Sequence, residues 1–293
     1  MRYSKPVFPL AFALLLLGLA RAAWAQGQFT GFDRNDYPGD AALPALHTEF
    51  RFAGYWLNAP PGETRNTWTG KRAILKENGF GFLVLFNGRM DAKLKGKDAA
   101  QLGTADGRAA VAAARREGFP QGVRIFLDQE EGGRLLPEQA AYIFAWIDAV
   151  RAEGARAGVY CSGIEPTGVA VHDASGETST AEDIAQRESA REKNSSSGNP
   201  AERLALWVAN DACPPAPGCT LDAPAMATAF PAPVRPFASV WQYAQSPRRA
   251  QFSASCPKNA AADGNCYARG LPQGAHVFVD LDVADSADPS GGR

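Results

Sequence analysis

Short apolar runs alternate with longer segments of helical spacing along most of the chain. Eight runs are largely apolar and lack the clean polar alternation of a half-exposed strand, which is typical of strands buried on both faces. They cover residues 29–33, 50–57, 80–86, 122–128, 157–162, 204–210, 237–244 and 275–283. Helical spacing predicts helices over 68–79, 104–118 and 136–154, each ending at a glycine, and a short helix near 181–192.

The order of these elements predicts the fold class. Eight strands, several of them separated by helices, predict an α/β protein with a (β/α)8, TIM-barrel-like architecture. The second half is expected to be irregular, because residues 165–200 form a polar surface excursion and later connections are poor in helix. Residues 284–293 are expected to form a loose tail. An open, doubly wound sheet is the alternative, although no G-x-G-x-x-G motif follows an early strand, so a dinucleotide site has no support.

The first 25 residues have the features of a secretory signal peptide. Arg2 and Lys5 precede an apolar run over 7–20, and the small-residue sequence AWA ends at Ala25. A membrane anchor is the alternative, but the run is shorter than the roughly 20 residues that a membrane span needs. We therefore expect an exported protein, periplasmic or extracellular, with one barrel domain over 26–293 and no membrane attachment after cleavage.

Charge and cysteines narrow the picture further. The chain has 30 Lys and Arg against 31 Asp and Glu, with no basic concentration, so no nucleic-acid partner is expected. Export permits disulfides, and the simplest pairing joins Cys213 to Cys219 and Cys256 to Cys266, with Cys161 left as a buried free thiol. Metal binding is the alternative for the cysteines, but no C-x-x-C spacing occurs and no histidine is near them.

Acidic residues fall at the ends of three predicted strands. They are Asp33 in the first, Asp128 and Glu130 in the fourth, and Asp280 with Asp282 in the last. The carboxyl ends of barrel strands form the reaction face, and closure places the first and last strands side by side. We therefore expect these carboxylates to gather at one mouth.

Alternation along the fourth strand separates Glu130 from its neighbour Glu131. Residues i and i+2 project to the same side, so Glu130 shares a face with Asp128, whereas Glu131 points away or begins the loop. Gathered carboxylates raise some pKa values and keep one acid protonated near neutrality. Such an acid can protonate a leaving oxygen, as glycosidic cleavage requires. The plain alternative is an acidic strand end that caps a turn.

Aromatic residues near strand ends are the second candidate set. Sugar sites use flat apolar rings with polar rims, although barrel core is the alternative for each ring. The substrate-binding residues that we predict are Tyr37, Tyr55, Trp207, Trp241 and Tyr243, together with Asp282; Trp56 and Phe86 also lie near strand ends. No serine–histidine–aspartate arrangement and no zinc ligand set is present in the sequence pattern, so no metal and no cofactor are predicted.

Five segments, in order, resemble family 25 glycoside hydrolases, the secreted barrel lysozymes. They are GFDRNDYPGD, FLDQE, LWVAND, VWQYAQS and VFVDLDV. The middle of the chain more closely resembles a relative of these enzymes, the exported glycoside-hydrolase-like domain of unknown function 1906. That likeness rests on FAGYWLNAPPG, GKRAILKENGFGFLVLFNG and ADGRAAVAAARREGFPQGVRIFLDQE, and the whole resemblance covers residues 29–284.

The resemblance implies roles for the acidic residues. Glu130 would be the general acid, Asp128 would support it or orient a substrate amide, and Asp33 and Asp280 would line the catalytic face. Asp282 departs from the family, which usually has asparagine there. The predicted function is a secreted glycoside hydrolase acting on cell-wall glycan, either peptidoglycan or a related polysaccharide. The alternative is a barrel that binds glycan without cleaving it. Phosphodiester cleavage is disfavoured, because it needs paired histidines or a metal cage.

Overall fold

The computed structural model describes residues 28–164, 178–194, 203–213, 229–245, 277 and 279–293. Eight strands close into a barrel in chain order, which confirms the predicted barrel. The strands are β1 Phe29–Asp33, β2 Phe52–Trp56, β3 Gly81–Asn87, β4 Arg124–Asp128, β5 Arg156–Ser162, β6 Ala205–Cys213, β7 Ala238–Ala244 and β8 Asp280–Ala284. β1 to β7 run parallel, whereas β8 runs antiparallel to both of its neighbours, β7 and β1.

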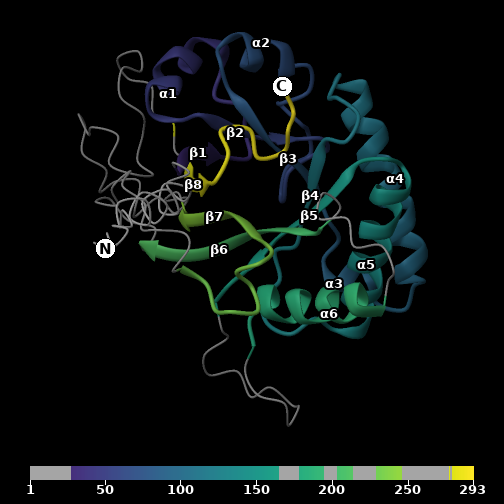
Figure 1. Ribbon diagram of the computed structural model, residues 1–293. Coiled ribbons are helices and arrows are strands. Elements are labelled where there is room, and N and C mark those ends of the chain that lie inside the picture. Colours follow the sequence, from purple (N-terminus) through teal and green to yellow (C-terminus); the bar gives the residue numbers. More distant parts are fainter. Residues whose placement is uncertain (1–27, 165–177, 195–202, 214–228, 246–276, 278) are drawn as a thin grey trace, which may run out of the picture.

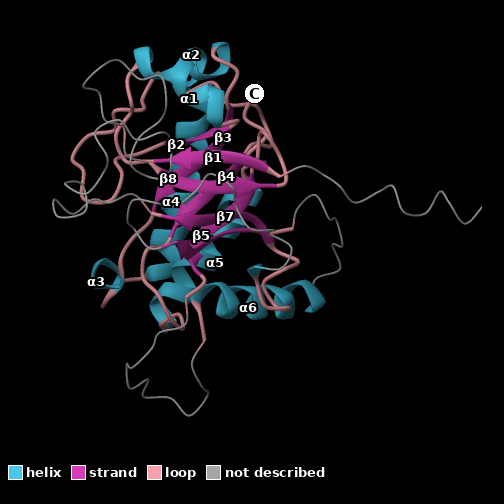
Figure 2. Ribbon diagram, turned by 90° about the vertical axis from the view of Figure 1, so that its left-hand side faces the viewer, coloured by secondary structure: helices cyan, strands magenta, loops and turns pink. Residues whose placement is uncertain are grey.

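The helices are concentrated in the first two thirds of the chain. They are the 3-10 turn η1 Asp40–Ala42, α1 Leu43–Glu49, α2 Arg72–Glu77, α3 Asp91–Leu94, α4 Ala99–Arg116, α5 Pro137–Ala152 and α6 Thr180–Asn194. Figure 1 shows α4, α5 and α6 covering the side of the barrel that holds β4 and β5, and Figure 2 shows α1 and α2 at one end of the strand layer with α6 at the other. In the part of the chain that the structure describes, no helix joins β6 to β7 or β7 to β8. The second half is therefore irregular, as predicted.

Two short helices, α1 and α3, were not predicted. The α1 helix starts with Leu43 and Pro44, and a proline in the first turn is favourable because its missing N–H has no partner there anyway. Its buried residues are Leu43 and Leu46, too few for a helical period to stand out in the sequence. Likewise α3 has four residues and buries only Leu94.

The C-terminal residues close the base of the barrel, so the prediction of a loose tail is wrong. Ser290 is completely buried and lies where β3 and β4 begin. Its N–H donates to Phe82 O at 2.9 Å, its Oγ accepts from Val84 N at 2.9 Å, and its carbonyl accepts from Arg124 N at 2.8 Å. Gly81 allows the approach, since a Cβ there would lie 1.9 Å from Ala287 O.

Backbone and side-chain hydrogen bonds hold the rest of this tail. Asp288 Oδ1 accepts from Phe82 N at 2.9 Å, and Arg72 Nη2 donates to Gly292 O at 2.6 Å. This arrangement could not be predicted from the sequence, because the tail is polar and non-periodic and its partners are mostly backbone groups distant in the chain.

Some predictions concern residues that the structure does not describe. The signal peptide over 1–25 and Cys219, Cys256 and Cys266 lie outside the described residues, as does the side chain of Cys213. Cys161 is a buried free thiol, as predicted, and burial raises its pKa. None of the helices in the described ranges has the length and the apolar character that a membrane span requires.

Candidate active site

A small pocket opens at the mouth of the barrel, where β1 to β7 end and β8 begins. Its lining combines carboxylates, amides and aromatic rings: Asp33, Asn35, Trp56, Leu85, Asp128, Glu130, Tyr160, Trp207, Gln242 and Asp280. The four residues that we predicted as catalytic thus line one pocket. Their chemical roles remain predictions.

Asp33 and Asp280 face each other across the seam that closes the barrel. They are direct register partners of the antiparallel β1–β8 pair. Asp280 reaches the mouth as the first residue of β8, and not as a carboxyl-terminal residue of a parallel strand as predicted. Room for Asp33 comes from Gly54 on β2, where a Cβ would lie 2.6 Å from the Asp33 Cβ.

Asp128 and Glu130 enter the pocket from β4. The strand ends at Asp128, but its ladder continues by one bond, because Gln129 N donates to Tyr160 O at 3.0 Å. The extended backbone keeps the alternation, so Gln129 is buried in the wall while Glu130 lines the pocket and reaches solvent.

Glu131 points away from the pocket and fastens the loop to two helices. Its Oε2 accepts from Asp91 N, at the start of α3, at 2.8 Å and from Gln139 Nε2, in α5, at 2.6 Å. The side chain is therefore an acceptor in the scaffold, which agrees with the predicted difference between Glu130 and Glu131.

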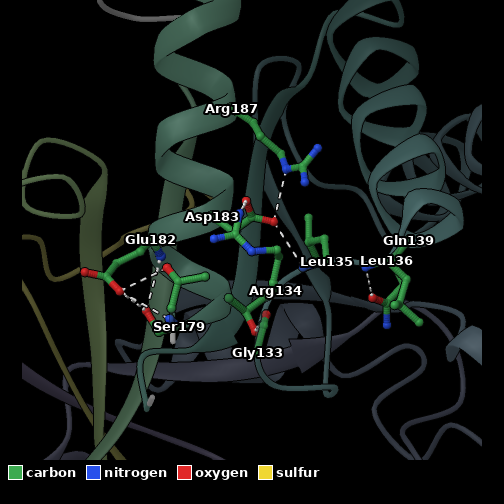
Figure 3. A network of polar contacts seen from close by, with 11 residues as sticks. Gly133, Arg134, Leu135, Leu136, Gln139, Ser179, Glu182, Asp183 and Arg187 are labelled. Carbon is green, nitrogen blue, oxygen red and sulfur yellow. Dashed lines mark hydrogen bonds and ion pairs between the residues drawn. The ribbon is translucent and has the colours of Figure 1, made fainter. Parts of the chain in front are cut away.

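The next residues of this loop are anchored to α6 (Figure 3). Asp183 is buried, and its Oδ2 accepts from Leu135 N at 3.0 Å and from Arg187 Nε at 3.0 Å. Thr180 Oγ1 donates to Gly133 O at 2.8 Å. The helix in the polar excursion therefore holds the loop that follows Glu130 in place.

Tyr160 and Gln242 form a neutral hydrogen-bond chain to Asp33. Tyr160 OH donates to Gln242 Oε1 at 2.9 Å, and Gln242 Nε2 donates to Asp33 Oδ2 at 2.8 Å. Burial raises the pKa of Tyr160 well above its usual value, and the nearby charges of Glu130, Asp33, Asp128 and Asp280 raise it further. The phenol thus stays protonated and donates.

Sequence reasoning missed Tyr160 and Gln242. Alternation along the strands could have found them, but only together with the register between strands. Tyr160 is in register with both Asp128 and Trp207, and Gln242 is in register with Asp282. Asn35 was also missed. Its loop is held by two indoles, since Trp56 Nε1 donates to Arg34 O at 3.1 Å and Trp68 Nε1 donates to Asn35 O at 2.8 Å.

The aromatic predictions divide by the face of the strand. Trp207 lines the pocket as predicted. On β2 it is Trp56 that lines the pocket, while Tyr55 has no exposed surface, packs against Phe82 and Phe119, and donates its OH to Glu117. A substrate contact at Tyr55 is therefore wrong, because adjacent strand residues point to opposite faces.

The same alternation corrects Trp241 and Tyr243. Gln242 lies between them and faces the pocket, so both rings lie on the outer side of β7. Their rings pack together with centroids 5.9 Å apart, and Trp241 Nε1 donates to Asn210 O at 2.8 Å. Neither residue lines the pocket.

Asp282 and Tyr37 lie near the pocket but outside its lining. Asp282 is completely buried, and its Oδ1 accepts from Trp207 Nε1 at 2.9 Å, so it cannot touch a substrate and that prediction is wrong. Tyr37 is partly buried, donates to Asp40 Oδ1 at 2.7 Å and lies two residues after Asn35. A substrate contact there stays a prediction. Across the described ranges, no group of three or more His, Cys, Asp or Glu residues is arranged to hold a metal.

Solved structures of similar shape come from several bacteria. An uncharacterized protein of B. stearothermophilus is 19% identical, with a TM-score of 0.54 over 87% of this chain and 95% of that chain, which shows a shared fold. The Tat-secreted protein Rv2525c of Mycobacterium tuberculosis is 12% identical, with a TM-score of 0.46 over 88% and 94%. The lysozyme of Streptomyces coelicolor is 11% identical, with a TM-score of 0.45 over 88% and 92%.

The sequence also matches one protein family. No curated protein matches this sequence. The family described as Rv2525c-like, glycoside hydrolase-like domain matches residues 54–209, more than half of the 293-residue chain. That match runs from β2 to β6 and includes Asp128, Glu130, Tyr160 and Trp207. The chain therefore belongs to the Rv2525c-like, glycoside hydrolase-like domain family.

Proposed function

We propose that this protein is an exported glycoside hydrolase that cleaves cell-wall glycan, either peptidoglycan or a related polysaccharide. The observation that carries the proposal is the convergence of Asp33, Asp128, Glu130 and Asp280 on one pocket with the rings of Tyr160 and Trp207. The family is glycoside hydrolase-like, and the first 25 residues have the pattern of a signal peptide.

Glu130 is the proton donor in this proposal. It is the pocket carboxylate that reaches solvent, whereas Asp33, Asp128 and Asp280 are buried. A substrate entering the mouth meets it first. As the bond between the anomeric carbon and the glycosidic oxygen breaks, Glu130 gives its proton to that oxygen. Water adds its hydroxyl to the anomeric carbon, and its remaining proton restores Glu130.

The buried carboxylates act on the charge that develops. Cleavage passes through an oxocarbenium-like state whose positive charge lies on the sugar ring. Asp33 and Asp280 are held side by side by the β1–β8 register and are placed to stabilise that charge. Asp128 lies next to Glu130 and favours its protonated form, because two neighbouring carboxylates resist double ionisation. Trp56 and Trp207 line the pocket and add apolar surface to its wall.

The test compares two adjacent glutamates. Glu130→Gln should lower the release of reducing ends from purified peptidoglycan by about 10²–10⁴-fold, the usual effect of losing a general acid. Glu131→Gln is the matched control, because glutamine keeps an oxygen for the Asp91 N–H, so activity should remain close to wild type. Circular dichroism checks that both variants fold.

Two other outcomes would contradict the proposal. An inactive Glu131→Gln beside an active Glu130→Gln would reverse the assignment. If the wild type releases nothing from any glycan but retains peptidoglycan in a pull-down, the protein is a glycan-binding barrel and the hydrolase proposal fails.

A further inference from the structure

Asp282 is a carboxyl group buried one layer below the pocket. It has no exposed surface and lies in β8 between two ladder partners, Gly31 on β1 and Gln242 on β7. Its Oδ1 accepts from Trp207 Nε1, but its Oδ2 is buried and receives no hydrogen bond from any residue that the structure describes. An ionised carboxylate in this position would leave a charged oxygen unsatisfied, which is strongly unfavourable.

The neighbours of that oxygen indicate where a proton lies. Burial is the largest cause that raises the pKa of Asp282 well above its ordinary value. The charges of Asp33 and Asp280 and a hydrogen bond with Asp33 raise this pKa further. Two carboxylate oxygens cannot hydrogen-bond to each other unless one carries a proton. Because Asp282 is the fully buried member of the pair, it is the one that stays neutral.

We propose that Asp282 is a positioning residue that stays protonated in the folded protein and donates a hydrogen bond to Asp33. Asp33 then receives two neutral donors, the Gln242 amide and the Asp282 acid, which fix its orientation and favour its ionised form. The catalytic part of this inference rests on the proposed function, whereas the protonation of Asp282 does not.

Charged and titratable groups face Asp282 from several strands. Asp33 comes from β1, Asp280 from β8 itself, and Tyr160 approaches through Gln242. Asp128, at the end of β4, and Glu130, two residues later, act on Tyr160. All of these groups are acidic, so they favour the neutral form of Asp282 in the same direction.

The first arm of the test measures stability and needs no substrate. The folded protein holds the Asp282 proton, whereas the unfolded chain releases it above pH of about 4. The free energy of unfolding should therefore fall as pH rises from there toward the pKa of the buried acid. Asp282→Asn lacks this loss, so its Tm should exceed that of wild type increasingly between pH 4 and pH 8. Infrared difference spectra at neutral pH should show that the variant has lost a carboxylic-acid band and not a carboxylate band.

The second arm measures the donor role. Asparagine keeps both an acceptor for Trp207 and a donor for Asp33, while Asp282→Leu keeps neither. Asp282→Asn should keep kcat within about threefold of wild type, and Asp282→Leu should lower it by about 10²-fold with little change in KM, as expected for a lost preorganising hydrogen bond.

The two arms separate the possible failures. A Tm difference that does not grow with pH, or a lost carboxylate band, overturns the protonation of Asp282. Equal activity of Asp282→Asn and Asp282→Leu, both folded, overturns its positioning role. If wild type hydrolyses no glycan, the proposed function fails, and the stability arm still decides the state of Asp282.

Discussion

The two ends of the barrel handle buried charge in opposite ways. At the mouth, buried Asp33, Asp128 and Asp280 surround a pocket open to solvent. At the base the charged side chains include the partly buried Arg124 and Arg156. Arg156, for example, donates to Gly122 O at 2.6 Å and to Ser290 O at 3.0 Å.

Electrostatics at the base still have a cost. Burial, with the charge of Arg156 as a second cause, lowers the pKa of Arg124 to about 10, although Asp285 opposes the shift. Burial also raises the pKa of Asp285. The base nevertheless seals with backbone hydrogen bonds, whereas the carboxylates of the mouth line a pocket. Substitutions at the mouth should therefore change activity more than stability, and substitutions at the base should do the reverse.

Among the substitutions that compare the two ends, we expect the largest effect, a loss of activity, at Asp128. Asp128→Asn keeps the shape of the side chain but removes its charge, and should lower kcat on peptidoglycan by about 10²-fold. Its Tm should equal or exceed that of wild type, because carboxylate repulsion at the mouth decreases. Asp148→Asn, on the exposed face of α5, is the control and should leave both quantities unchanged. A large loss of Tm in Asp128→Asn would show that the mouth is stabilised by its acids, contrary to this comparison.

The base should respond in stability. Ser290→Ala removes the acceptor for the buried Val84 N–H, which should lower the free energy of unfolding by about 1–3 kcal/mol in urea titrations. Activity per folded molecule should not change. Ser286→Ala is a matched control in the same tail, since its hydroxyl accepts from the partly buried Asp288 N–H, and it should have the smaller effect. Equal effects from the two serines would argue that the tail does not seal the base.

The smallest effect is expected in the wall between the two ends, at Tyr55. Tyr55→Phe removes the hydrogen bond to Glu117 and should destabilise by about 1 kcal/mol, without a change in KM. Trp56→Phe, one residue later, reshapes the pocket and should raise KM. A rise in KM for Tyr55→Phe alone would restore Tyr55 as a substrate contact and reverse the facing of β2.

Much of the fold could be predicted from the local pattern of apolar and polar residues. The continuous apolar runs located all eight strands, and β1 was bounded correctly as 29–33, because strands buried on both faces leave a signal that needs no distant information. The α5 helix was equally clear, with Pro137 in its first turn and Gly154 just beyond its end. The grouping of Asp33, Asp128, Glu130 and Asp280 followed from barrel closure once the strands were known.

Tertiary structure decided what depends on direction, facing and distant partners. The apolar pattern of β8 did not reveal that this strand runs antiparallel to its neighbours. That direction brings Asp280 to the mouth as the first residue of the strand. Only the structure shows which face of a strand lines the pocket. Trp56 and Gln242 face the pocket, whereas their neighbours Tyr55 and Trp241 face outward. The sequence does not distinguish the members of each pair, because both suit a strand and a shift of one residue turns every side chain to the other face. The prediction for the tail failed because Ser290 is held by partners far away in the sequence, such as Val84 of β3, which is 206 residues away. The sequence by itself thus determined the strands and the acids of this protein, and only the closed barrel decided which side chains share the pocket and which are buried beneath it.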